Sequence, residues 1–179
     1  MLHRLRLVVL NFLEFAVWGA YLTSLGRYLG SIGMGSQIKW FFAMQGIVSI
    51  FTPTIMGLVA DRHIQAQKLL ALCHGLAGLF MVAAGGYCHV SATPEFAPLF
   101  LLYSFSVAFF MPTLSLANSV SFYVLVKNAM DPVKTFPHIR IFGTLGFICS
   151  MLVTNFVKIN GVAMQDSYMQ LFSSGITTS

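Results

Sequence analysis

The stretch "FPHIRIFGTLGF", residues 136–147, begins an apolar run that continues to Val157, yet it carries an arginine one turn inside the run. A guanidinium group in the hydrocarbon of a bilayer costs about 2.5–3.5 kcal/mol even on insertion scales. Arg140 therefore needs a compensating partner or a function within the membrane. The rest of the sequence decides whether a membrane is the right solvent for this segment.

The composition of the chain is that of a membrane protein. Of its 179 residues, 57% are hydrophobic and only 8% are charged, and the mean hydropathy is +0.80. Soluble domains carry about 25% charged residues. The apolar residues lie in blocks close to the ~20 residues that cross a bilayer as a helix. The sequence therefore predicts an all-α, polytopic bundle of transmembrane helices.

The apolar blocks predict five helices and the start of a sixth. The predicted helices cover residues 7–29, 38–60, 69–88, 99–126 and 139–157, and the sixth begins near residue 168. The first block resembles a signal peptide, but no small-x-small cleavage site follows, so we interpret it as an uncleaved helix. The last segment, "YMQLFSSGITTS", has too few apolar residues to cross a membrane. We expect a helix cut short there, and a polar tail is the alternative.

The basic residues predict the orientation of the chain in the membrane. Lys and Arg favour the cytoplasmic side of a membrane. They precede the first helix and recur in the second-to-third and fourth-to-fifth connections: Arg4, Arg6, Arg62, Lys68, Lys127 and Lys134. The opposite connections hold Arg27, Lys39 and Lys158. The bias places the amino terminus in the cytoplasm. Scattered as they are, these residues form no nucleic-acid patch.

Motifs for metal, cofactor or catalytic chemistry do not stand out in the sequence. The three cysteines, Cys73, Cys88 and Cys149, are far apart and lie in apolar segments. They form no C-x-x-C pair or His/Cys cluster typical of a metal site. A nucleophile with an evident paired base is also not found. We therefore expect neither an enzyme nor a bound metal or cofactor.

The opening stretch places three functional groups on one helix face. Arg140, Thr144 and Phe147 are spaced i, i+4 and i+7, which aligns them along a helix. Gly143 and Gly146 lie between them and would let a neighbouring helix approach closely. The face offers a guanidinium, a hydroxyl and an aromatic ring. The alternative is an arginine that reaches out to the lipid headgroups.

Glu14 is a second ionisable residue inside an apolar block, about 10 Å into the first helix at 1.5 Å per residue. Intramembrane carboxylates usually face the interior of a bundle or a watery cavity. Trp18 follows on the same face. Glu14 and Arg140 enter from the same side to similar depths, so a structural ion pair between them is one hypothesis. A carboxylate that exchanges a proton during transport is the other.

The fourth helix adds an amide next to a proline. Pro112 predicts a bend, and Ser115, Asn118 and Phe122 follow on one face. Asn118 either cross-links helices or contacts a ligand. For Gln45 and His74, hydrogen bonding between helices is the favoured interpretation. Polar groups beside aromatic rings on several helices suit a small uncharged molecule with a flat ring and hydroxyl groups.

Four segments of the chain, in order, closely resemble the nucleoside:H⁺ symporter family of the major facilitator superfamily. They are "FLEFAVWGAYLTSLG", "GLVADR", "MPTLSLANSVSFY" and "FPHIRIFGTLGF". The resemblance implies proton-coupled nucleoside uptake by alternating access across the cytoplasmic (inner) membrane of a bacterium. It also implies nucleoside-binding roles for Arg140, Thr144 and Phe147. Asn118 and Trp18 fall in matching segments, and we add them to the expected site.

The same resemblance assigns a conformational latch to Gly57, Asp61 and Arg62, although "HIQAQK" after Arg62 departs from the superfamily pattern. Superfamily members place substrate between two six-helix bundles. The chain is therefore expected to be a partial, amino-terminal domain that lacks a carboxy-terminal partner half. Two alternatives stay open: transport of a sugar or another polar metabolite, and a membrane interaction module that transports nothing.

Overall fold

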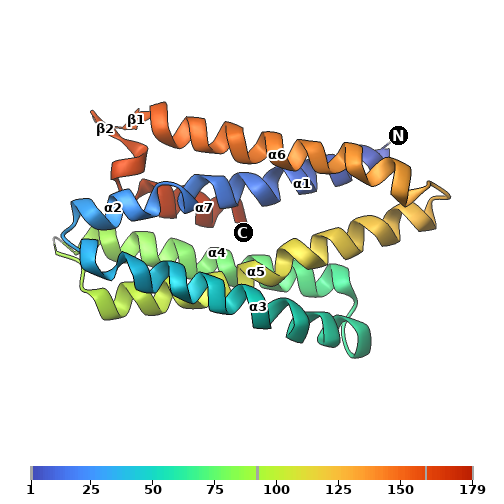
Figure 1. The fold of residues 1–179 in the computed structure, drawn as a ribbon, viewed down its shortest axis with the longest axis horizontal. Helices are drawn as coiled ribbons and strands as arrows, with labels where there is room; N and C mark the ends of the chain where they lie inside the picture. Colours follow the sequence, from blue (N-terminus) through green and yellow to red (C-terminus); the bar gives the residue numbers. More distant parts are fainter. Residues whose placement is uncertain (1, 92, 160, 179) are drawn as a thin grey trace.

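Apolar helices dominate the computed structural model, which describes residues 2–91, 93–159 and 161–178 (Figure 1). The α helices are α1 (Leu2–Leu22), α2 (Leu25–Ser31), α3 (Ile38–Arg62), α4 (Ala66–Val90), α5 (Phe96–Lys127), α6 (Pro132–Phe156) and α7 (Met169–Thr178). Short 3₁₀ turns, η1 (Gly35–Gln37) and η2 (Met164–Asp166), precede α3 and α7. Five segments are long and apolar enough to cross a membrane, with α1 and α2 counted together. The predicted transmembrane helical bundle is confirmed.

The helices pack side by side in two groups. Helix α1 lies along α6, while α5 packs against both α3 and α4, and α7 contacts α4 and α1 (Figure 1). The amino terminus, the α3–α4 turn and the α5–α6 connection lie at one end of the bundle. Helix α2 and the α4–α5 loop lie at the other end. Alternate connections are thus at opposite ends, as the spacing of apolar blocks requires.

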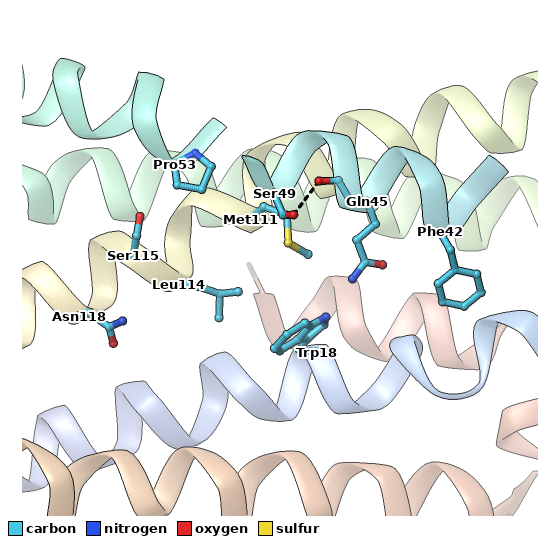
Figure 2. Close-up of a pocket in the computed structure, with 10 residues that line it drawn as sticks. Trp18, Phe42, Gln45, Ser49, Pro53, Met111, Leu114, Ser115 and Asn118 are labelled. Atoms are coloured by element: carbon cyan, nitrogen blue, oxygen red, sulfur yellow. Dashed lines mark hydrogen bonds between the residues drawn. The ribbon is translucent and has the colours of Figure 1, made fainter. Parts of the chain in front are cut away.

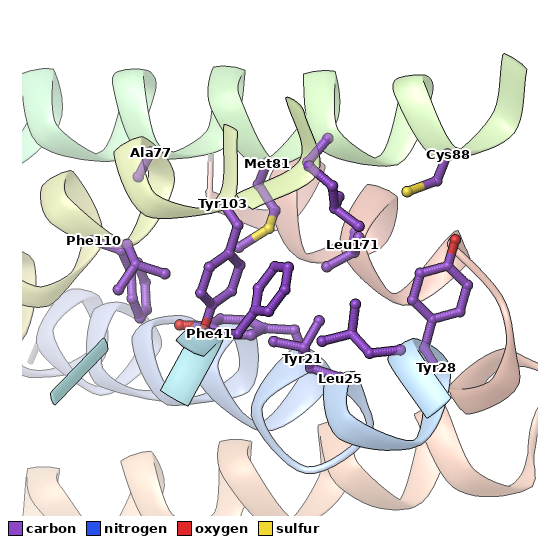
Figure 3. Close-up of a cluster of buried hydrophobic side chains, with 14 of the residues drawn as sticks. Tyr21, Leu25, Tyr28, Phe41, Ala77, Met81, Cys88, Tyr103, Phe110 and Leu171 are labelled. Atoms are coloured by element: carbon purple, nitrogen blue, oxygen red, sulfur yellow. The ribbon is translucent and has the colours of Figure 1, made fainter. Parts of the chain in front are cut away.

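An aromatic core joins α1, α3 and α5 (Figure 3). The rings of Tyr21 and Tyr103 meet edge to face with centroids 6.2 Å apart, and Phe41 lies 5.2 Å from Tyr103. Edge-to-face contacts of this kind add about 0.5–1.5 kcal/mol beyond burial alone. The Tyr103 hydroxyl donates a hydrogen bond to Gln45 Oε1 at 2.9 Å. Gln45 therefore bonds between helices, as its sequence position predicted.

The first span is broken, although the sequence predicted one helix over residues 7–29. Helix α1 ends at Leu22 and α2 begins at Leu25. Between them the Thr23 and Ser24 hydroxyls donate to the carbonyls of Gly19 and Ala20 at 3.3 and 2.8 Å. Hydroxyl groups that bond to their own helix compete with its backbone ladder and favour a bend. The apolar pattern hides this break because apolar residues such as Leu25 and Leu29 continue beyond it.

Helix α6 begins seven positions before the predicted residue 139, so the prediction of a connecting loop there was wrong. The Asp131 side chain caps the helix and accepts a hydrogen bond from the Val133 amide at 2.9 Å. Pro132 occupies the first turn, where its missing N–H is not needed. Polar residues after this cap were interpreted as a loop, but they form the exposed first turns of the helix.

A small hairpin after α6 was also missed. Strands β1 (Lys158–Ile159) and β2 (Val162–Ala163) pair antiparallel, with Lys158 opposite Ala163. The Asn-Gly pair in "KINGVA" is a strong hairpin signal. Gly161 has φ of +83°, a conformation that glycine adopts without strain. The hairpin is a local addition to an otherwise helical fold.

Glycines bring α1 and α6 into close contact. A methyl group at Gly146 would overlap the carbonyl oxygen of Phe12, and one at Gly143 would lie 2.8 Å from the Phe15 ring. On the other helix, a methyl group at Gly19 would lie 2.5 Å from the Phe147 carbonyl oxygen. Any larger side chain at these positions would push the helices apart. The predicted role of Gly143 and Gly146 in close helix approach is confirmed.

Candidate functional site

A cavity of about 520 Å³ lies between α1, α3 and α5 (Figure 2). Trp18 enters it from α1, and α3 and α5 supply most of the wall. The residues lining it are Trp18, Phe42, Gln45, Gly46, Ser49, Pro53, Met111, Leu114, Ser115 and Asn118. Its volume falls within the range of about 300–1,000 Å³ typical of small-molecule sites. The wall carries no ionisable side chain, which suits an uncharged occupant.

Two buried polar atoms of the cavity residues make no hydrogen bond to the described part of the chain. They are Trp18 Nε1, a donor, and Asn118 Oδ1, an acceptor. Buried polar groups are nearly always paired, so an unpaired donor and acceptor beside one cavity indicate a ligand or water. Asn118 was expected either to cross-link helices or to bind a ligand. Its free carbonyl oxygen favours the second role.

None of the three expected ligand residues of α6 lines the cavity. The Arg140 guanidinium lies 4.1 Å from the centre of the Phe15 ring, a cation–π contact. Thr144 is exposed and Phe147 is half-buried. The Phe147 ring meets Trp18 edge to face with centroids 6.1 Å apart. Trp18 is therefore the point where the cavity and the Arg140 face of α6 meet.

Glu14 does not pair with Arg140, contrary to one hypothesis from the sequence. The carboxyl group is 1% exposed. Its Oε1 lies 2.5 Å from Thr113 Oγ1, and its Oε2 lies 2.8 Å from His74 Nε2. Adjacent residues on a helix point about 100° apart, so Phe15 faces α6 and Arg140 while Glu14 faces α4 and α5. In the described ranges no carboxylate lies within 4.0 Å of Arg140.

Sequence reasoning missed Thr113 and most of the α3 wall. Thr113 follows Pro112 in an apolar helix and is fully buried. Phe42, Ser49 and Pro53 are residue types that occur commonly in membrane helices, so the sequence alone gives no reason to single them out. A buried threonine opposite an intramembrane carboxylate is recognisable only once the helices are placed in space. His74 was expected to bond between helices, and its contact with Glu14 across α4 and α1 agrees.

The predicted latch residues lie at the end of α3. Gly57 is half-buried, while Asp61 and Arg62 are exposed. They lie beside the α3–α4 turn, at the same end of the bundle as the amino terminus (Figure 1). Within residues 2–91, 93–159 and 161–178, neither charge takes part in an ion pair. Their expected role as a latch therefore stays a prediction.

Spanning helices around a cavity with free polar groups define a class, the polytopic α-helical membrane proteins with a small-molecule site inside the bundle. Comparison with known proteins gives the family. The family described as "Nucleoside H+ symporter" matches residues 1–178. The chain therefore belongs to the nucleoside H⁺ symporter family.

Curated relatives and a solved structure agree with this assignment. The chain is 39% identical to nucleoside permease NupG of Escherichia coli (strain K12), over 94% of this chain and 38% of that protein. It is 33% identical to the xanthosine permease of the same organism, over 90% of this chain and 38% of the permease. A crystal structure of nucleoside transporter NupG superposes with a TM-score of 0.82 at 34% identity, over 99% of this chain and 42% of that one. The chain thus spans about two fifths of the length of these relatives.

Proposed function

We propose that this chain binds a nucleoside as part of a proton-coupled nucleoside transporter in the cytoplasmic (inner) membrane of a bacterium. The observation that carries the proposal is the uncharged cavity between α1, α3 and α5, with the free Trp18 Nε1 and Asn118 Oδ1 beside it. Membership of the nucleoside H⁺ symporter family supports the substrate class and the coupling ion. Relatives named as nucleoside and xanthosine permeases support the substrate further.

The chemistry of a nucleoside fits these groups. Its base is flat and apolar on both faces, while its edges and the ribose carry donors and acceptors. Aromatic rings of Trp18 and Phe42 can contact the base, and Asn118 Oδ1 can accept a hydrogen bond from an amino or hydroxyl group. Arg140, Thr144 and Phe147 extend the surface beyond Trp18, where the guanidinium can donate to the ribose or base. Arg140 thus acts in binding rather than as a headgroup anchor.

Alternating access requires a second bundle against which this one moves. Relatives of the chain are long enough to supply such a bundle, since the matched region covers only 38% of nucleoside permease NupG. We place the amino terminus in the cytoplasm because the basic residues concentrate at the end of the bundle that holds it. In that orientation Gly57, Asp61 and Arg62 lie on the cytoplasmic side, where a latch between bundles would close.

Uptake of labelled uridine or adenosine tests this function in cells that express the full gene product containing this sequence. We expect uptake that exceeds the empty-vector control, falls when the proton gradient is collapsed, and is inhibited by unlabelled nucleosides. Inhibition by sugars in place of nucleosides would contradict the substrate. Uptake that is indifferent to the proton gradient would contradict proton coupling while leaving nucleoside transport intact.

A further inference from the structure

The environment of Glu14 shows a proton-binding arrangement separate from the nucleoside cavity. The carboxyl group is 1% exposed and does not line that cavity. It contacts His74 of α4 through Oε2 and Thr113 of α5 through Oε1. An isolated carboxylate at such a depth is unfavourable, so the group must carry a proton or be matched by a protonated partner. An imidazole is the side chain best suited to share that proton.

The hydrogen bonds around Thr113 depend on whether the carboxyl group carries a proton. Thr113 Oγ1 lies 2.5 Å from Glu14 Oε1 and 2.5 Å from the Phe110 carbonyl oxygen. The Thr113 hydroxyl is placed to donate to either oxygen, but its single proton must be divided between them. Each contact has a proton of its own when Glu14 is protonated and donates to Thr113, which then donates to Phe110. When Glu14 is ionised, the Thr113 proton turns to the carboxylate and the Phe110 carbonyl loses it.

This exchange of hydrogen bonds takes place beside the nucleoside cavity. Phe110 and Thr113 flank Pro112 on α5, and the neighbouring Met111 and Leu114 line the cavity. On α1, Trp18 lies one turn beyond Glu14 and also lines it. A proton that joins or leaves Glu14 therefore changes the hydrogen bonding of the α5 turn whose Met111 and Leu114 line the cavity.

We propose that Glu14 and His74 form a proton-binding couple, and that Thr113 transmits its protonation state to the nucleoside cavity through α5. The second part deepens the proposed function and rests on it, while proton binding by the couple does not. With a proton on Glu14, the couple is neutral overall, as carboxyl and imidazole. Without it, a single negative charge is left in the bundle.

The other charged and titratable groups on the surrounding helices are poor candidates for binding this proton. On α1, Tyr21 lies two turns beyond Glu14, and on α5 Tyr103 packs against Tyr21. On α6, Arg140 faces Phe15 rather than Glu14. Helix α7 has no ionisable side chain, and its Thr178 backbone faces the imidazole. Phenols stay neutral across physiological pH.

Infrared spectroscopy of the full protein tests proton binding without any nucleoside. The carbonyl stretch of a buried protonated carboxyl group should change with pH in the wild type and be absent in Glu14→Gln. His74→Gln should shift the midpoint of that change by about one pH unit, because the two groups interact directly.

Glu95→Gln and His89→Gln are matched controls, since both residues are exposed, and both should leave the band in place. A band unchanged in Glu14→Gln overturns the proposal. If Glu14→Gln does not fold, His74→Gln decides: an unshifted pH midpoint of the carboxyl band in that variant overturns the proposal.

Transport measurements then test the link to the cavity. Glu14→Gln and His74→Gln should lose accumulation of nucleoside above the external concentration. They should keep exchange of internal for external nucleoside, which needs no net proton movement. Variants that accumulate nucleoside like the wild type, or lose exchange and accumulation equally, overturn the coupling. A wild type that neither accumulates nor exchanges nucleosides contradicts the proposed function instead. Proton binding by Glu14 and His74 then still depends on the infrared result alone.

Discussion

Helix α1 has two very different sides. Towards α6 it is closed by glycines, and Gly19, Gly143 and Gly146 leave no room for even one methyl group. Towards α3 and α5 it borders a cavity of about 520 Å³, with Trp18 Nε1 free of any partner in the described chain. Tight backbone contact fixes position but offers no functional groups. The open side presents Trp18 Nε1 and, across the cavity, Asn118 Oδ1, which make no hydrogen bond within the described chain.

The difference predicts which residues serve the fold and which serve the proposed nucleoside site. On the closed side the smallest residue is required, and its replacement should affect stability. On the open side a change should affect binding while the bundle keeps its stability. Variants on the two sides can therefore break or sharpen this contrast.

The largest effect is expected from Gly146→Leu on the closed side. Its Cβ would overlap the Phe12 carbonyl oxygen of α1, and backbone cannot yield as a flexible side chain does. We expect a loss of about 3 kcal/mol in stability, measured as a lower unfolding temperature in detergent or nanodiscs. Gly75→Leu is the matched control, because nothing lies within 4 Å of a Cβ there. Equal unfolding temperatures for the two variants would contradict the closed side.

Asn118→Leu should give the largest effect on binding. It removes the free acceptor Oδ1 beside the cavity, and one lost hydrogen bond of about 1.5 kcal/mol raises the nucleoside Kd about tenfold. Equilibrium binding of labelled nucleoside to the purified protein measures it. Asn128→Leu, just after α5, is the control and should bind as the wild type does. An unfolding temperature that falls with affinity would show a structural role for Asn118.

Arg140→Lys asks whether the α6 face belongs to the same binding surface. Lysine keeps the charge but loses the planar group that contacts the Phe15 ring at 4.1 Å and its paired donors. We expect nucleoside affinity to fall about fivefold, or about 1 kcal/mol. Arg6→Lys, at the exposed start of α1, should have no effect. Unaltered affinity in Arg140→Lys would confine the site to the cavity between α1, α3 and α5.

Trp18→Phe should have the smallest effect of the four. The ring stays aromatic but the Nε1 donor is lost, which we expect to raise the Kd two- to threefold, or about 0.5 kcal/mol. Trp40→Phe is the control, because Trp40 is exposed on α3. A fall in affinity as large as that of Asn118→Leu would make the indole donor a principal contact.

The sequence predicted the bundle well because the lengths of the apolar blocks can be compared directly with the length of helix that crosses a bilayer. It singled out Arg140, Glu14 and Asn118 because polar groups in apolar helices are conspicuous, and Asn118 and Trp18 line the cavity. It failed where the outcome depended on which way neighbouring residues point. Phe15 rather than Glu14 faces Arg140, and Thr113 draws no notice in sequence.

The interruption at Thr23 and Ser24 affects how the first span can deform. Two carbonyls there bond to side-chain hydroxyls, so bending the backbone disrupts fewer helix bonds than elsewhere. Helix α2 is tied by Arg27 to Asp166 at 2.5 Å, just before α7, while α1 packs closely on α6. A bend at the interruption would therefore carry α2 along with the η2–α7 side of the bundle and leave the packing of α1 on α6 in place.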